Sequence, residues 1–245
     1  ASIYNWTVDK WQHEPNTTRQ MPAEFQSDQS FNYEDLESFW KQTALPNQGV
    51  CRIIGPFSGD YADGEASLDM QYLAAAGFGA TNWYYTTTGW MYSFASQLNS
   101  MKDEDIPHVV SMSWGWSEAQ QCSNIDPDTC QHLGLDSAGY VARVNTEFQK
   151  LGVRGVSLFS SSGDSGCNGR SDSACQDSVF HATFPGGSPY VTSVGATEFK
   201  LNTTKHGFTD VPICKEFGCV VSGYEQAVST NVSMFTSGGG FSNFF

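Results

Sequence analysis

The thirty residues Ser137–Gly166, SAGYVARVNTEFQKLGVRGVSLFSSSGDSG, contain one helix-and-strand unit of the expected α/β fold. Apolar residues recur near the 3.6-residue period, as at Val144, Phe148 and Leu151, and predict a helix over 137–151. The apolar run 155–160 then predicts a strand that ends in a turn rich in serine and glycine. This order is typical of α/β sheets, in which ligands bind beyond the carboxyl ends of the strands.

The same alternation extends in both directions along the chain. Short apolar runs predict further buried strands at 50–56, 80–85, 109–113 and 190–194. Helical patterns cover 64–76 and 88–101, with Asp63 placed to cap the first helix and Gly77 to end it. The order predicts a parallel sheet with helices on both faces. Hairpins and loops are expected over 196–236.

Residues 1–48 differ from the rest of the chain because they are polar and rich in Gln and Asn. We interpret them as an N-terminal extension that packs on the core, with a short helix around 32–42 that Asn32 caps. Residues 49–245 then form the α/β domain.

The composition limits the possible functions. The chain has 245 residues, with 12 basic and 26 acidic side chains and a net charge of −14. Hydrophobic residues make up 39% and charged residues 16%, which is typical of a folded domain. The acidic balance argues against nucleic acid or an anionic membrane surface as partner. No apolar run approaches the roughly 20 residues that span a bilayer, and Ala1 resembles a processed end more than a signal peptide.

Glycosylation sequons and cysteines favour a secreted or lysosomal protein. Four sequons begin at Asn5, Asn16, Asn202 and Asn231. Three cysteine pairs lie close enough in sequence to form local disulfides, although six cysteines allow 15 connectivities: Cys122/Cys130, Cys167/Cys175 and Cys214/Cys219. The seventh, Cys51, is expected to be a buried inert thiol, or else to pair with a cysteine outside this chain. No set of residues has the spacing of a metal site.

Two carboxyl groups on the helix 64–76 are the first catalytic candidates. Glu65 and Asp69 are four residues apart, so they share one face of the helix. Apolar neighbours predict that this helix is largely buried, and two carboxylates in a low-dielectric site share a proton, which suits acid–base work. Alternatively, Glu65 simply favours the helix dipole in the first turn.

Asp164 is the next candidate, because it follows the strand 155–160 and is flanked by Gly163. A protonated Asp at the end of a parallel strand can donate a hydrogen bond to a developing oxyanion. Alternatively, Asp164 belongs to an ordinary turn. Gly-Asp-Ser-Gly also surrounds the nucleophile of chymotrypsin-like proteases, which would select Ser165, but those enzymes need an all-β scaffold.

Ser113, Trp114 and Gly115 follow the strand 109–113 at the point where it opens into a loop. Such an edge can accept an extended peptide as an added strand. A core strand followed by a turn explains the same residues equally well.

Three segments, in order and spacing, resemble the sedolisins, a family of serine-carboxyl peptidases. They are GEASLDMQY at 64–72, SSGDSG at 161–166 and TSGGGFS at 236–242. The segment FPGGSPYVTSVG at 184–195 is also similar, and the resemblance runs from about residue 20 to residue 245. It implies a subtilisin-like α/β fold and peptide-bond hydrolysis at acid pH.

The resemblance also implies roles for individual residues. Glu65 matches the general base, Asp69 the acid that holds Glu65, and Asp164 the oxyanion-hole acid, which must be protonated to donate. Ser113–Gly115 resembles the strand that lines the substrate cleft. The segment at 237–240 resembles one with a backbone role.

The family's nucleophile lies in Gly-Thr-Ser-Ala-Ser, and this string does not occur in the chain. We therefore expect the nucleophilic Ser, and the calcium site of the family, to lie outside these residues, with no cofactor in the chain itself. The Ser is expected on a C-terminal chain that is a separate partner after processing, unless that part is lost. The fold is then incomplete on the C-terminal side, and core surface is expected to be exposed there. The rival hypothesis is an inactive sedolisin-like module with a binding or structural role. Tripeptidyl release and internal cleavage both stay open.

Overall fold

A computed structural model of the chain describes residues 17–26, 30–172, 174–177, 179–205, 210–239 and 241–245. Six strands form a sheet in the order β2-β3-β1-β4-β6-β8, and every neighbouring pair is parallel. The strands are β1 Arg19–Phe25, β2 Val50–Ile54, β3 Thr81–Thr87, β4 Val109–Met112, β6 Ser157–Ser161 and β8 Thr192–Val194. The predicted α/β fold is confirmed.

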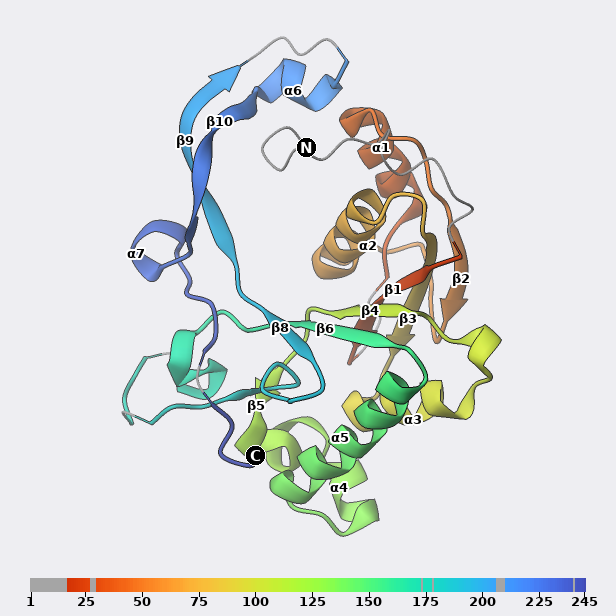
Figure 1. The fold of residues 1–245 in the computed structure, drawn as a ribbon, viewed down its shortest axis with the longest axis vertical. Coiled ribbons are helices and arrows are strands. Elements are labelled where there is room, and N and C mark those ends of the chain that lie inside the picture. Colours follow the sequence, from red (N-terminus) through yellow and green to blue (C-terminus); the bar gives the residue numbers. More distant parts are fainter. Residues whose placement is uncertain (1–16, 27–29, 173, 178, 206–209, 240) are drawn as a thin grey trace.

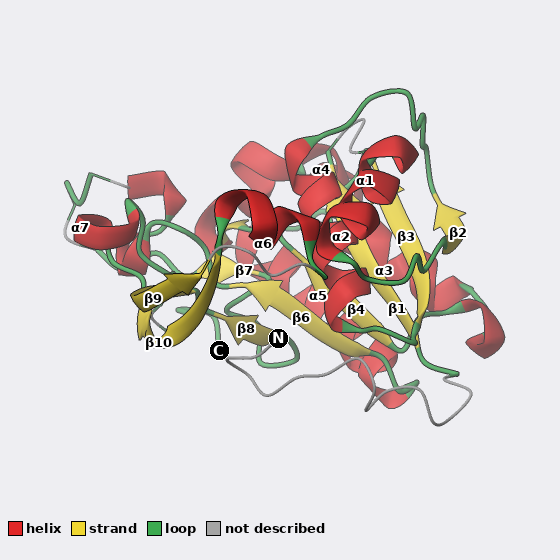
Figure 2. Ribbon diagram, turned by 90° about the horizontal axis from the view of Figure 1, so that it is seen from above, coloured by secondary structure: helices red, strands yellow, loops and turns green. Residues whose placement is uncertain are grey.

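Helices cover both faces of this sheet (Figure 2). On one face, α1 Tyr33–Thr43 and α2 Gly64–Ala76 pack around Tyr84 of β3. On the other, α3 Met91–Ser100 and α5 Ser137–Val153 pack around Tyr85. The two tyrosines point to opposite faces because successive residues of a strand alternate. The predicted helices were therefore correct, and Asn32 caps α1 as expected.

Strand β1 was missed by the sequence analysis. It lies between β3 and β4 in the sheet, and Met21, Ala23 and Phe25 are fully buried. This part of the segment 1–48 contributes to the core instead of packing on it. Pro22 and Glu24 interrupt the apolar pattern of the strand, which is why its sequence does not indicate a central position.

Helix α2 begins and ends where the sequence predicted. The Asp63 carboxylate accepts a hydrogen bond from the Glu65 N–H at 2.9 Å, and the Gly77 N–H donates to the Leu73 carbonyl. The expectation of a largely buried helix was wrong, because Leu68 and Tyr72 are 50% and 62% exposed. The buried face consists mainly of alanines with Met70, and such small side chains let the helix lie close to the sheet.

Smaller elements surround the sheet (Figure 1). The antiparallel hairpin of β9 and β10 projects from the body, and α6 at its far end contacts α1. The remaining helices and strands are β5 Trp116–Ser117, β7 Thr183–Phe184, β9 Thr197–Lys205, β10 Cys219–Ala227, α4 Pro127–Leu133, α6 Pro212–Phe217 and α7 Thr230–Ser233. Short 3₁₀ turns lie at Asp103–Asp105, Glu118–Gln120, Gly166–Asn168 and Arg170–Asp172, and a π turn at Gln121–Ile125.

One side of the sheet is partly uncovered, as the sequence predicted. Phe159 of β6 is 36% exposed and Val194 of β8 is 52% exposed, although both lie on strands of a parallel sheet, which are normally covered. Phe241 and Phe245 are also exposed, whereas Phe244 packs against the core.

The cysteines follow the prediction in part. Disulfides join Cys122 to Cys130 and Cys214 to Cys219. The predicted pair of Cys167 and Cys175 is not formed, and both are free thiols; the Cys167 Sγ instead contacts the Asn168 side chain.

Cys51 is exposed, not buried. It lies on the edge strand β2, where the register shifts between Val50 and Arg52 and leaves Cys51 without a partner residue on β3. An edge position with a bulge turns a side chain out of the core.

Within the described part of the chain, no helix is long and apolar enough to cross a membrane. Among the sequons, Asn231 is exposed on α7 and Asn202 falls within β9. Asn5 and Asn16 lie outside the described residues.

Candidate active site

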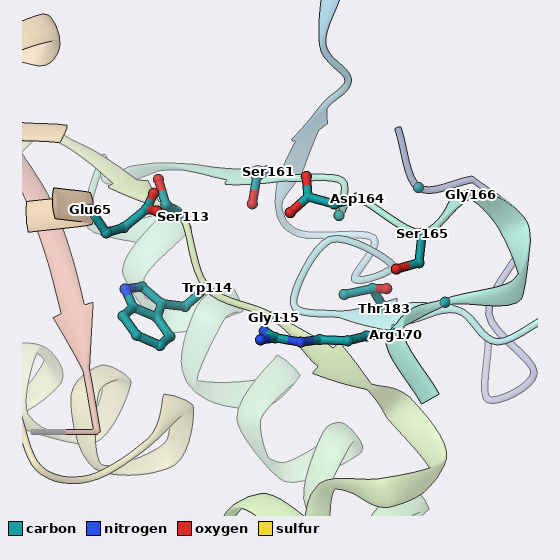
Figure 3. A pocket seen from close by; sticks show the side chains of 13 residues that line it. Glu65, Ser113, Trp114, Gly115, Ser161, Asp164, Ser165, Gly166, Arg170 and Thr183 are labelled. Carbon is teal, nitrogen blue, oxygen red and sulfur yellow. The ribbon is translucent and has the colours of Figure 1, made fainter. Parts of the chain in front are cut away.

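A pocket of about 340 Å³ lies at the carboxyl edge of the sheet (Figure 3). It is bounded by the first turn of α2, the residues after β4 and the loop after β6. Five of the six predicted catalytic and substrate-binding residues line it: Glu65, Ser113, Trp114, Gly115 and Asp164. The sixth, Asp69, does not line the pocket but accepts a hydrogen bond from Ser113, which does. The structure therefore brings together side chains that are up to 99 positions apart in sequence.

Glu65 and Asp69 form a carboxyl pair along α2, one turn apart. The Ser113 hydroxyl donates a hydrogen bond to Asp69 Oδ2 at 2.7 Å. Partial burial raises the pKa of Glu65, and the negative charge of Asp69 raises it further. Burial also raises the pKa of Asp69. The helix therefore holds two carboxyl groups that take up protons at higher pH than free carboxylates do.

A third carboxyl group, Glu24 of β1, extends this pair into the core. Glu24 is fully buried, and the Trp114 indole N–H donates to its Oε2 at 2.7 Å. Burial raises the pKa of Glu24 to about 8, with a further contribution from the charge of Asp69. Protonated Glu24 can donate to Asp69, which would satisfy its otherwise unpartnered Oε1.

Glu24 is the functional candidate that the sequence analysis missed. The available signal is an acidic residue among Met21, Ala23 and Phe25, all of them buried. A fully buried carboxyl group is rare unless it is paired, and one with a strongly raised pKa beside a pocket is a candidate functional residue. Because the strand itself was not predicted, this signal could not be used.

Asp164 sits on the opposite side of the pocket, exposed in the loop after β6. Gly163 before it has a φ of +100°, a conformation that favours glycine. The segment 236–238 runs beside this loop. The Gly166 N–H donates to the Thr236 carbonyl at 2.9 Å, and the Gly238 N–H donates to the Gly163 carbonyl at 2.8 Å.

Gly238 has no room for a side chain, because a Cβ there would lie 1.8 Å from the Ser162 carbonyl oxygen. The hydroxyl of the adjacent Ser237 accepts a hydrogen bond from the Ala196 N–H. The segment 236–238, which we call the backbone strap, thus fixes the Asp164 loop mainly through main-chain contacts.

The chymotrypsin-like alternative for Ser165 finds no support in the site. Ser165 lines the pocket, but no histidine is among the described residues that do so. The surrounding scaffold is a parallel α/β sheet, whereas that alternative needs an all-β scaffold.

One group of potential metal ligands occurs in the part of the chain that the structure describes. Asp172, Asp177 and His181 offer ligand atoms within 4.8 Å of one another. Both Asp172 oxygens accept backbone hydrogen bonds, and His181 is bonded to Asp177. Calcium prefers an all-oxygen shell of six to eight ligands, so this group, which includes a histidine, does not fit a calcium ion.

Comparison with known proteins identifies several relatives, although no family model matches the sequence. Physarolisin of Physarum polycephalum is 41% identical over an alignment of 226 positions, which covers 91% of this chain and 38% of that protein. Tripeptidyl-peptidase 1 of Homo sapiens is 32% identical over an alignment of 250 positions, which covers 99% of this chain and 37% of that protein. The chain therefore spans less than two fifths of the length of these relatives.

A solved structure shares the fold. Pseudomonas sedolisin, a serine-carboxyl proteinase complexed with two molecules of pseudo-iodotyrostatin, matches with a TM-score of 0.58 and 19% identity. The match covers 95% of this chain and 60% of that one.

Proposed function

This chain belongs to the sedolisin family, and from that premise we propose that it is part of an acid-acting serine-carboxyl peptidase. In this proposal it supplies the general base and the oxyanion-stabilising acid. The observation that carries the proposal is the carboxyl pair Glu65–Asp69, with raised pKa values, facing Asp164 across one pocket. Sites of this kind are candidates for acid–base catalysis.

Glu65 is the proposed general base. A serine hydroxyl placed in the pocket would attack the peptide carbonyl carbon while its proton passes to Glu65. Glu65 then returns this proton to the leaving amine as the C–N bond breaks, and water hydrolyses the resulting acyl-enzyme. Asp69 holds Glu65 in place, and its own orientation is set by the Ser113 hydroxyl and by Glu24.

Asp164 is the proposed oxyanion donor. It can donate a hydrogen bond to the developing oxyanion only when it is protonated, so the reaction needs acid pH. The backbone strap supports this role because it positions the loop that carries Asp164.

Ser113–Gly115 is proposed to bind the substrate backbone as an added strand. A Cβ at Gly115 would lie 2.7 Å from the Thr183 methyl group. The absence of a side chain therefore lets this edge of the pocket approach β7 closely.

The nucleophilic Ser, and any calcium site, are proposed to lie on a C-terminal partner segment. Two observations support this: the chain spans less than two fifths of its relatives, and the sheet is uncovered at Phe159 and Val194. The two disulfides and the sequons favour a lysosomal or secreted protein. The alternative, an inactive module, is less well supported because a purely structural role does not require carboxyl groups with raised pKa values.

Peptide hydrolysis at pH 4 tests the proposal. The 245-residue chain would be assayed with and without the downstream segment that contains the Ser. We expect hydrolysis only when that segment is present. No hydrolysis by the complete protein, with an intact fold, would favour the inactive module.

A further inference from the structure

Arg170 introduces a positive charge into the pocket that also holds Glu65 and Asp164. It is the one basic side chain among the thirteen residues that line this pocket. Figure 3 shows it extended along the pocket wall toward Gly115, on the side away from Asp164. Among the described residues, Arg170 forms no ion pair with either acid of the pocket, so charge pairing within the protein does not explain its position.

The Arg170 guanidinium has no protein acceptor within the described residues. The other four arginines each donate at least one hydrogen bond to the protein, at Arg19, Arg52, Arg143 and Arg154. A guanidinium carries five N–H donors in a planar fork that matches a carboxylate. Those of Arg170 are available to a ligand in the pocket.

The guanidinium is nevertheless held in place. Its central carbon lies 4.9 Å from the centre of the Trp116 ring, and the Trp116 indole N–H donates to Gln120 at 3.0 Å. Gly169 fixes the backbone before it, since it has a φ of +68° and an added Cβ would lie 2.6 Å from the His181 carbonyl oxygen. A stacked, pre-oriented arginine loses less conformational entropy when it binds an anion.

We propose that Arg170 forms a subsite for a negatively charged side chain of the peptide substrate, a glutamate or aspartate close to the scissile bond. This inference rests on the proposed peptidase function and adds a specificity to it. A carboxylate can pair with the guanidinium through two parallel hydrogen bonds. Glu65, which must be ionised to act as the base, lines the same pocket and repels a carboxylate, whereas the Arg170 guanidinium attracts it.

The subsite has a distinctive pH dependence. A guanidinium stays charged over the whole acid range, whereas a substrate glutamate loses its charge near its ordinary pKa of about 4.3. The preference for glutamate over glutamine is therefore present at about pH 5.5 and lost at about pH 3. A preference based on shape alone would not change with pH, because glutamate and glutamine have nearly the same shape.

Paired peptides test this subsite on the complete protein. The two peptides of a pair differ at one position, where one has Glu and the other has Gln. The set of pairs covers each position from the third residue before the scissile bond to the second residue after it. At one position we expect kcat/KM to favour Glu about tenfold at pH 5.5, with no preference at pH 3. Arg170→Gln should abolish the preference, and Arg170→Glu should favour a Lys peptide instead. The matched control is Arg143→Gln, an arginine stacked on Tyr92 outside the pocket, which should keep the wild-type ratio.

Two results would overturn the subsite: Glu and Gln peptides that react within twofold of each other at every position at pH 5.5, or a Glu preference that Arg170→Gln retains. If no peptide is cleaved at all, the peptidase proposal fails, and the subsite is then tested by binding. Fluorescence anisotropy of the same labelled peptides should show tighter binding of the Glu peptide at pH 5.5. Equal affinities would reject the subsite.

Discussion

Three carboxyl groups lead from the core to the pocket, and each influences the next. Glu24 is fully buried, Asp69 is half-buried and Glu65 reaches the pocket. Full ionisation of all three would place like charges side by side in a region of low dielectric constant, which is costly. A proton kept on Glu24 lets it donate to Asp69, and Asp69 can then remain the acceptor for the Ser113 hydroxyl.

Glu24 makes the stability of the protein depend on pH. Its pKa in the folded protein is raised from 4.5 to about 8, so folding takes up a proton between these values. The resulting stabilisation is fully present below about pH 4.5 and is lost as the pH rises through 8. Glu24→Gln keeps the neutral form, because an amide can accept from Trp114 and donate to Asp69.

We therefore expect wild-type protein to lose several kcal/mol more of unfolding free energy than Glu24→Gln between about pH 5 and pH 8. Thermal or denaturant unfolding across this range measures the difference. Parallel curves for the two proteins would contradict the assignment of a neutral Glu24.

At the scale of elements, the backbone strap 236–238 determines the position of Asp164 more than any side chain does. Its N–H and carbonyl groups pair with those of Gly163 and Gly166. The close approach at Gly238 leaves no space for a Cβ, whereas at Gly239 nothing lies within 4 Å of the added atom. Two neighbouring glycines therefore differ sharply in their tolerance of alanine.

Gly238→Ala should destabilise the protein by about 1–3 kcal/mol, because the strap must move away from Ser162. It should also lower kcat/KM at pH 4, since the Asp164 loop moves with it. The matched control, Gly239→Ala, should change stability by less than about 0.5 kcal/mol. Equal effects of the two substitutions on stability and activity would show that the strap does not position the loop.

Elements with a strong local signal were predictable, and those set by distant neighbours were not. Helix α2 was predicted with its cap at Asp63 and its acids in place, because capping and helical spacing are local properties. Strand β1 was missed because its central position depends on β3 and β4, and Glu24 was missed with it. The exposure of Cys51 depends on an edge position and a bulge, and neither is visible in a single sequence.

At the scale of the whole molecule, part of one face of the sheet, at β6 and β8, is left uncovered by the helices that the structure describes. Phe159 and Val194 lie on this face near the carboxyl edge of β6 and β8, beside the loop that carries Asp164. A downstream segment packed here would bury them and bring its serine to the pocket. The same packing would account for the exposed core surface and would supply the proposed nucleophile.

Val194→Asp tests this packing in the complete protein, with Val153→Asp as its control. Val194 is 52% exposed and Val153 is 90% exposed in this chain. Neither substitution should therefore lower the stability much unless another segment buries the site. We expect Val194→Asp to destabilise the complete protein by about 2–4 kcal/mol and Val153→Asp by less than about 0.5 kcal/mol. Small effects of both would mean that the face stays in solvent.

The central claim is that the acids of this chain perform the proton transfer of an acid peptidase, and Glu65→Gln tests it most directly. The measurement is kcat/KM for one peptide at pH 4 in the complete protein, wild type against variant. Glutamine fills the same space but cannot accept the proton, so we predict a loss of about 10²- to 10⁴-fold with an unchanged unfolding temperature at that pH. Activity within about threefold of wild type would contradict the assignment of Glu65 as the general base.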